Sequence, residues 1–124
     1  MTDVTVRAVS DPGAQLVAEV VVPDLKVTLD YLVSLGFIVE RTSETFAVLR
    51  WESSRLFLAQ DSAATVVERW VNIRVIVPDV DAMWDKVARV GGQVISAIGD
   101  RSYGLRDFIV RGPGGVEIRF GQFL

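Results

Sequence analysis

The tripeptide Val-Pro-Asp occurs twice in this chain of 124 residues, at 22–24 and again at 77–79, which is 55 positions later. In each copy a run rich in β-branched residues ends at the proline. The aspartate that follows is a good helix N-cap, because its carboxylate can accept hydrogen bonds from free backbone N–H groups. Apolar residues then recur at spacings of three and four as far as Gly36 or Gly91, where a helix can end. The repeat therefore predicts two copies of a strand followed by a helix.

The sequence after each predicted helix repeats as well. "SSRLFLAQ" at 53–60 resembles "GVEIRFGQ" at 115–122 with an offset of 62, and the same offset aligns Phe46 with Phe108. The other predicted strands are 37–42, 45–51, 93–98 and 105–110, with a further strand at 4–9 and a tight turn at 111–115. Each half therefore has the order βαβββ.

These halves predict an α+β fold in which two βαβββ modules form one curved mixed sheet, with the helices on its outer face. We expect a single domain over 1–124. Within it, module one spans about 16–60, a linker 61–68, and module two about 69–122. The sequence does not decide whether the two modules pair within one chain or exchange between chains.

Alternation along the predicted strands separates two faces of this sheet. One face is apolar throughout, as at Val20, Val75 and Phe120, and is expected to pack under the helices. The opposite face mixes charged with apolar side chains, as at Glu19 and Phe57. A mixed concave surface is typical of a small-molecule cavity.

Composition excludes several kinds of function. The chain has no cysteine and no histidine, which removes thiolate chemistry and the commonest general base and transition-metal ligand. The net charge is −3 and the basic residues are scattered, so we expect no nucleic-acid partner. The sequence shows neither a signal-peptide pattern nor an apolar run long enough to span a membrane, so we expect a cytoplasmic protein with no membrane partner.

Three stretches carry a resemblance to a known family: "VVVPDLKVTLDYLVSLGF", "VIVPDVDAMWDKVARVGG" and "YGLRDFIVRGPGGVEIRFGQ". Together they resemble the glyoxalase/bleomycin resistance/dioxygenase superfamily, which has the vicinal oxygen chelate fold. The resemblance covers about residues 16–122. Metal enzymes of the family hold a divalent ion through His or Glu on the inner strands of both modules.

The matching positions in this chain are Val17, Phe57, Asn72 and Arg119. Valine and phenylalanine cannot bind a metal, asparagine is a poor transition-metal ligand, and arginine repels a cation. We therefore expect no metal and no cofactor. The chain is most similar in this respect to the metal-free, bleomycin-resistance-like branch, whose members are small homodimers that sequester a drug in grooves lined by both subunits.

The candidate ligand-binding residues follow from the mixed face and from this resemblance. They are Glu19, Trp51, Phe57, Asn72, Arg74, Tyr103, Glu117 and Arg119, with Trp70 as a further aromatic. Aromatic rings can stack on a ligand, the two glutamates can meet a cation, and Arg119 can grip a carboxylate, phosphate or enolate oxygen. A simpler interpretation pairs Glu19 with Arg74 across neighbouring strands, and places Trp84 in the core.

Three functions remain open at this point. The first is a metal-independent homodimer that binds an antibiotic or metabolite in a concave groove and acts by sequestering it, without catalysis. The alternative is a metal-free isomerase or lyase in which Glu19 or Glu117 acts as general base and Arg119 stabilises an oxyanion. The third is a vestigial pocket on a fold that serves only assembly.

Overall fold

The computed structural model describes residues 16–64 and 72–124. The strand predicted at 4–9 and the candidate Trp70 lie outside these ranges, as does part of the predicted linker. Module one contains β1 (Ala18–Val22), α2 (Leu25–Leu35), β2 (Ile38–Thr42), β3 (Phe46–Trp51) and β4 (Ser54–Gln60). Module two contains β5 (Ile73–Ile76), α3 (Val80–Val90), β6 (Gln93–Asp100), β7 (Leu105–Arg111), the 3-10 helix η2 (Pro113–Gly115) and β8 (Glu117–Phe123).

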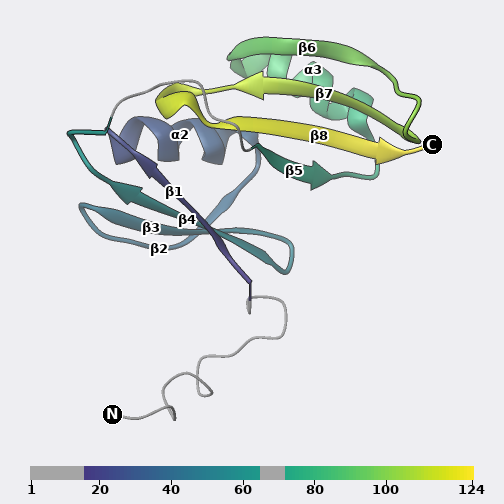
Figure 1. Cartoon of the computed structure of the whole chain (residues 1–124). Helices are drawn as coiled ribbons and strands as arrows, with labels where there is room; N and C mark the ends of the chain where they lie inside the picture. Colours follow the sequence, from purple (N-terminus) through teal and green to yellow (C-terminus); the bar gives the residue numbers. More distant parts are fainter. Residues whose placement is uncertain (1–15, 65–71) are drawn as a thin grey trace.

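Each module forms a four-stranded mixed sheet, with the order β1-β4-β3-β2 in module one and β5-β8-β7-β6 in module two (Figure 1). The first strand runs parallel to the last strand of its module, and the remaining pairs are antiparallel. The predicted α+β fold with two βαβββ modules is confirmed. In the described part of the chain, β1 and β5 are edge strands, so the curved sheet consists of two hydrogen-bonded halves.

The doubled Val-Pro-Asp motif starts both helices. The Asp24 carboxylate accepts a hydrogen bond from the N–H of Val27 at 3.3 Å, and Asp79 does the same for Ala82 at 3.1 Å. Gly36 ends α2 with a φ of 125°, a backbone conformation that favours glycine. Each helix has 11 residues, and within 16–64 and 72–124 neither has the length and apolar character to cross a membrane.

A glutamine in the last strand of each module provides a second cap. Gln60 on β4 accepts a hydrogen bond from the N–H of Leu25 at 2.9 Å, and Gln122 on β8 accepts one from Val80 at 2.9 Å. Each glutamine satisfies a backbone donor in the first turn of the helix, which has no partner within the helix itself. The last strand of each module is thereby tied to the start of its own helix.

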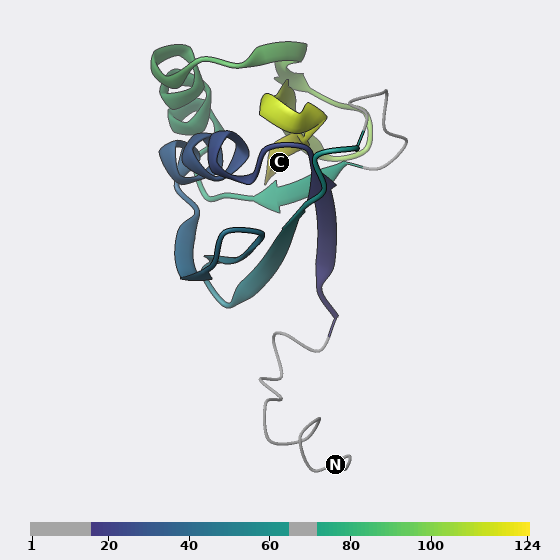
Figure 2. The ribbon, with the colours of Figure 1, turned by 90° about the vertical axis from the view of Figure 1, so that its left-hand side faces the viewer.

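One hydrophobic core joins the two modules within the chain. Phe120 on β8 is fully buried, and its ring lies 5.8 Å from that of Trp51 on β3 and 5.6 Å from that of Phe108 on β7. Trp84 on α3 packs edge-on against Phe108 at 5.1 Å, as expected for a core residue. Figure 2 shows α2 and α3 beside each other along this core.

The structure corrects the alignment of the repeat in one pair of strands. Ala47 lies opposite Leu58 in module one, and Phe108 lies opposite Phe120 in module two. The residue equivalent to Phe108 is therefore Ala47, and the expected match of Phe46 with Phe108 is one position wrong. The cause is the hairpin between the last two strands, which is one residue longer in module two.

Candidate functional site

Two cavities lie at the neighbouring edges of the two sheets, where β1 and β5 come together, a place that we call the β1–β5 seam. Their volumes are about 360 Å³ and about 480 Å³, and Ala18 and Ile73 line both of them. The smaller cavity also extends to the hairpin between β3 and β4. Cavities that hold small organic ligands begin at roughly 300 Å³. In the described part of the chain β1 and β5 belong to different sheets, and ligand-sized space lies where these sheets meet.

Cavity one, the smaller, has a mainly apolar wall with charged residues at one side. Its lining comprises Ala18, Phe37, Trp51, Glu52, Ser54, Arg55, Leu56, Ile73, Arg74, Val75 and Ile76. The Trp51 ring is held at 5.0 Å from Phe37, so it presents a fixed aromatic surface. An apolar wall beside arginines can hold a flat organic molecule that carries a polar group.

Cavity two has a different polar set. Its lining comprises Ala18, Glu19, Val20, Val21, Asn72, Ile73, Val116 and Glu117. Three of the predicted site residues, Glu19, Asn72 and Glu117, meet here. Two others, Trp51 and Arg74, line cavity one, whereas Phe57, Tyr103 and Arg119 belong to neither lining. The structure therefore divides the candidate residues between two cavities and the adjoining sheet faces.

The Glu19–Arg74 ion pair considered above is not among the ion pairs of the described residues. Arg74 instead has its Nη1 atom 3.8 Å from Oδ2 of Asp107 on β7. Its guanidinium also lies 5.7 Å from the centre of the Tyr103 ring, within the range of a cation–π contact. Arg74 is thus directed along the face of the second sheet.

Asp107 is the centre of a polar cluster that sequence reasoning missed. Its side chain is only 2% exposed, and it accepts hydrogen bonds from Nε of Arg101 at 2.8 Å and from the Tyr103 hydroxyl at 2.5 Å. Burial alone would raise the pKa of Asp107, but these hydrogen bonds and the charges of Arg101 and Arg119 hold the pKa below its ordinary value. Asp107 is therefore an ionised buried carboxylate.

Arg101 is fixed by several acceptors besides this carboxylate. Its Nη2 atom also donates to Oγ of Ser96 at 3.2 Å and to the backbone oxygens of Ala97 and Asp107. These contacts tie β6 to the loop before β7. One signal in the sequence could have revealed the cluster, since Asp107 is a single carboxylate inside the apolar run "LRDFIV".

Arg119 lies beside this cluster on β8. Its strand position is opposite Arg74 on β5, so both side chains leave the same face of the sheet. The Nε atom of Arg119 is buried and has no hydrogen-bond partner among the residues that the structure describes. Arg119 is the residue that the sequence predicted to bind an anionic oxygen of a ligand.

Glu117 is less available to contact a ligand than the sequence suggested, because its carboxylate is already paired. Its carboxylate is 12% exposed and accepts hydrogen bonds from Nε and Nη2 of Arg111, the first at 3.0 Å. Glu19 on β1 is exposed at the rim of cavity two. Phe57 on β4 packs against Phe46 with ring centres 5.3 Å apart.

The four positions that the resemblance matches to metal ligands carry side chains poorly suited to a metal ion. Val17 and Phe57 supply no donor atom, Asn72 is exposed, and Arg119 stands beside the second cation Arg74. Within 16–64 and 72–124, no three carboxylate side chains gather closely enough to hold a metal ion.

Comparison with protein families decides the identity of the fold. The family model described as the glyoxalase/bleomycin resistance protein/dioxygenase superfamily matches residues 14–120. The chain belongs to this superfamily. A comparison with curated protein sequences gave no significant match.

Solved structures of the superfamily share the fold at low sequence identity. A bleomycin-binding protein complexed with bleomycin is 17% identical with a TM-score of 0.75, over 93% of this chain and 100% of that chain. A bleomycin resistance determinant encoded on the transposon Tn5 is 17% identical with a TM-score of 0.75, over 92% of this chain and 98% of that chain. The bleomycin-binding protein from bleomycin-producing Streptomyces verticillus, complexed with copper(II)-bleomycin, is 23% identical with a TM-score of 0.68. The match covers 85% of this chain and 92% of that chain.

Proposed function

We propose that this protein binds a small organic molecule at the β1–β5 seam and acts by sequestering it, without a metal and without turnover. The observation that carries the proposal is the pair of ligand-sized cavities between the edges of the two sheets, of about 360 and 480 Å³. The superfamily structures that share the fold support it, since two of them are complexes with bleomycin or copper(II)-bleomycin. The proposed class of ligand is an antibiotic or a metabolite.

Metal independence is part of the proposal. It is supported by the donor chemistry of Val17, Phe57, Asn72 and Arg119, which replace the side chains that bind metal in related enzymes. The expected result is that EDTA treatment leaves ligand affinity unchanged, and that the purified protein contains no stoichiometric transition metal.

A homodimer is the proposed assembly. Exposed apolar side chains flank the seam, with Val21 on β1 40% exposed and Ile76 on β5 43% exposed. A second copy that covers this side would remove apolar surface from water and deepen both cavities. Analytical ultracentrifugation at micromolar concentration is expected to give twice the monomer mass.

The metal-free enzyme alternative finds less support. A general base needs a carboxylate that can accept a proton near the substrate. Glu117 is engaged by Arg111, and Glu19 lies exposed at the rim of cavity two. Sequestration requires only binding, for which the two cavities offer enough space.

The test is a thermal-shift screen with bleomycin, copper(II)-bleomycin, aromatic acids and phosphorylated metabolites. A ligand present at 100 times its dissociation constant stabilises the folded state by about 2.7 kcal/mol. The variant Ala18→Trp fills the seam, because Ala18 lines both cavities, and should abolish the shift. The matched control Ala82→Trp adds the same ring to an exposed position on α3 and should retain it. Absence of a shift with every compound would contradict the proposal.

A further inference from the structure

The face of the second sheet beside cavity one carries more positive than negative charge. Arg74 and Arg119 are register partners on neighbouring strands, and like charges placed directly opposite each other destabilise a sheet. Asp107 is the carboxylate that faces them, and it already accepts hydrogen bonds from Arg101 and Tyr103. Three arginines therefore share one carboxylate, which leaves two positive charges on this face.

Two nearby carboxylates are already paired with other arginines and do not remove this excess, whereas Glu52, which also lines cavity one, is exposed. Glu117 is bound by Arg111, and the two form a neutral pair. Glu40 in module one is held by Nε of Arg55 at 2.7 Å. The surplus is local, because the whole chain has a net charge of −3.

Arg119 also has an unmet hydrogen-bonding need. Within 16–64 and 72–124 its buried Nε atom has no partner, and an unpaired buried donor on a charged group is costly. An oxyanion next to Arg119 would accept this hydrogen bond. Its negative charge would also offset the repulsion between Arg74 and Arg119. Arginine is suited to this role, since its planar guanidinium donates to two oxygens at once.

Arg74 connects this charged face to cavity one. It is part of the cavity lining, together with the apolar side chains of Trp51, Ile73 and Ile76. The ring of Tyr103, which is 55% exposed, has its centre 5.7 Å from the Arg74 guanidinium. We propose that the ligand of cavity one carries a carboxylate or phosphate group on a flat apolar body. Arg74 binds this group from the cavity lining, and the group extends past Arg74 to its register partner Arg119, which lies outside the lining. The proposal deepens the sequestration function and rests on it.

The experiment uses four probes with one aromatic body and different head groups: 2-naphthoate, 2-naphthyl phosphate, neutral 2-naphthamide and cationic 2-naphthylmethylamine. Isothermal titration calorimetry with the full chain measures the affinity of each. Charge-assisted hydrogen bonds favour an anion over its neutral analogue by on the order of tenfold or more. We expect at least one of the two anions to bind about tenfold tighter than the amide, and the amine to bind weakest. The better of the two anions identifies the head group as carboxylate or phosphate.

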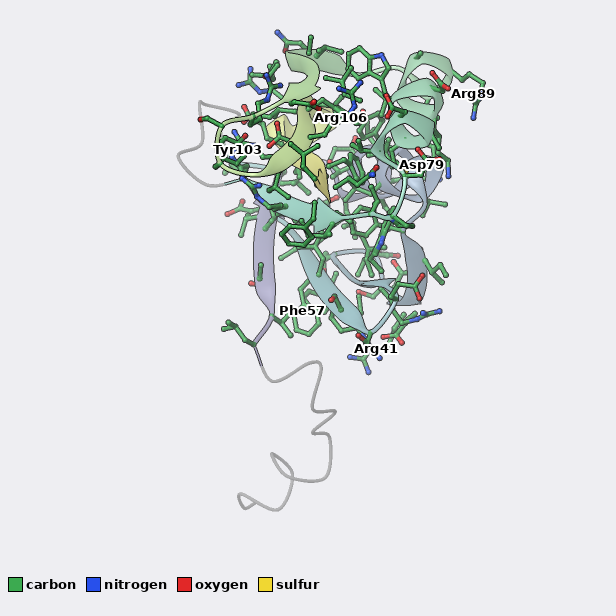
Figure 3. All side chains as sticks on the ribbon, turned by 90° about the vertical axis from the view of Figure 1, so that its right-hand side faces the viewer. Arg41, Phe57, Asp79, Arg89, Tyr103 and Arg106 are labelled. Atoms are coloured by element: carbon green, nitrogen blue, oxygen red, sulfur yellow. The ribbon has the colours of Figure 1, made fainter. Side chains whose placement is uncertain are left out.

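Variants separate binding by Arg119 from a general effect of charge. Arg119→Gln should remove the preference for the anion, a loss of about tenfold, while binding of the amide is retained. Arg119→Lys keeps the charge but not the planar donor pair, and should restore part of the preference. The matched control is Arg89→Gln, which removes one positive charge from the exposed surface of α3 and should leave the preference intact. Figure 3 shows Arg89 on the helix side of the second sheet, away from Tyr103.

Retained amide binding shows that a variant is folded, so loss of anion preference in Arg119→Gln reports the head-group site. Equal affinity for the amide and both anions in the native protein would overturn the proposal, and so would tightest binding of the amine. An unchanged anion preference in Arg119→Gln would also overturn it. In these cases sequestration itself stands if compounds of the thermal-shift screen bind, and it fails separately if none does.

Discussion

The two modules carry different chemistry at equivalent positions of the same sheet. In module one, Phe46 and Phe57 form an aromatic pair with ring centres 5.3 Å apart. In module two, the positions with the same strand register carry Asp107 and Arg119. The neighbouring edge strands differ as well, because Glu19 on β1 corresponds to Arg74 on β5.

The helix-facing side shows the opposite behaviour. Leu58 in module one and Phe120 in module two are equivalent, and both are fully buried. The capping residues Asp24 and Asp79 are identical in type and in contact. Packing thus preserves the duplicated fold on one side of the sheet, while the other side is free to diverge in its polar chemistry.

The largest losses of stability should come from substitutions on the helix-facing side of the sheets, and they should be similar in the two modules. Leu58→Ala and Phe120→Ala each remove a fully buried side chain, and the lost contacts and the cavity left behind cost about 3–4 kcal/mol of unfolding free energy. Urea denaturation measures this cost. If only one of the two variants is strongly destabilised, the modules do not share one cooperative core.

The next effect should differ between modules. Asp107→Ala leaves Arg74, Arg101 and Arg119 without their buried carboxylate, and breaking such a pair costs about 3 kcal/mol. Glu40→Ala removes the carboxylate that pairs with Arg50 and Arg55 in module one, which is 34% exposed, and should cost about 1 kcal/mol or less. Equal destabilisation of the two variants would contradict the distinction between a buried and a half-exposed cluster.

The pH dependence of the unfolding free energy should show whether Asp107 is held in its ionised form. The pKa of Asp107 is lowered in the folded state, so the stability that its ionised form contributes is complete above the unfolded pKa of about 4. This stability is lost as the pH falls through the lower folded pKa. The difference in unfolding free energy between the native protein and Asp107→Asn should be constant near neutral pH and should shrink in acid. A difference that grows in acid would mean that Asp107 is not held ionised.

The smallest effects should again be equal in the two modules. Asp24→Ala and Asp79→Ala each remove one N-cap hydrogen bond and should cost about 1 kcal/mol. The glutamines Gln60 and Gln122 keep their own bonds to the helix starts and limit the loss. Thermal unfolding can compare the two variants directly, and a loss in only one of them would break the equivalence of the caps.

The sequence was sufficient for the fold because its signals are local and occur twice. Proline, an aspartate cap and a terminal glycine mark each helix, and alternation identifies the buried side of the strands. The register of β3 and β7 was misjudged, because Phe46 and Phe108 look equivalent although the hairpin after β7 is one residue longer.

The candidate site was only partly accessible to sequence reasoning. Arg74 and Arg119 were named because alternation places them on the concave face. Asp107 and Arg101 were not, since their contact depends on how the loop before β7 folds back onto β6. The division of the candidates between two cavities depends on how the two sheets meet at their edges, which no local pattern encodes.

The central claim is that the ligand binds at the β1–β5 seam. A titration followed by two-dimensional ¹H–¹⁵N NMR tests it most directly, with 2-naphthyl phosphate and bleomycin added separately. The predicted result is a set of shifted backbone signals around Ala18, Ile73 and Arg74, with the exposed surface of α3 around Arg89 unaffected. Shifts confined to the α3 surface, with none at the seam, would contradict the claim.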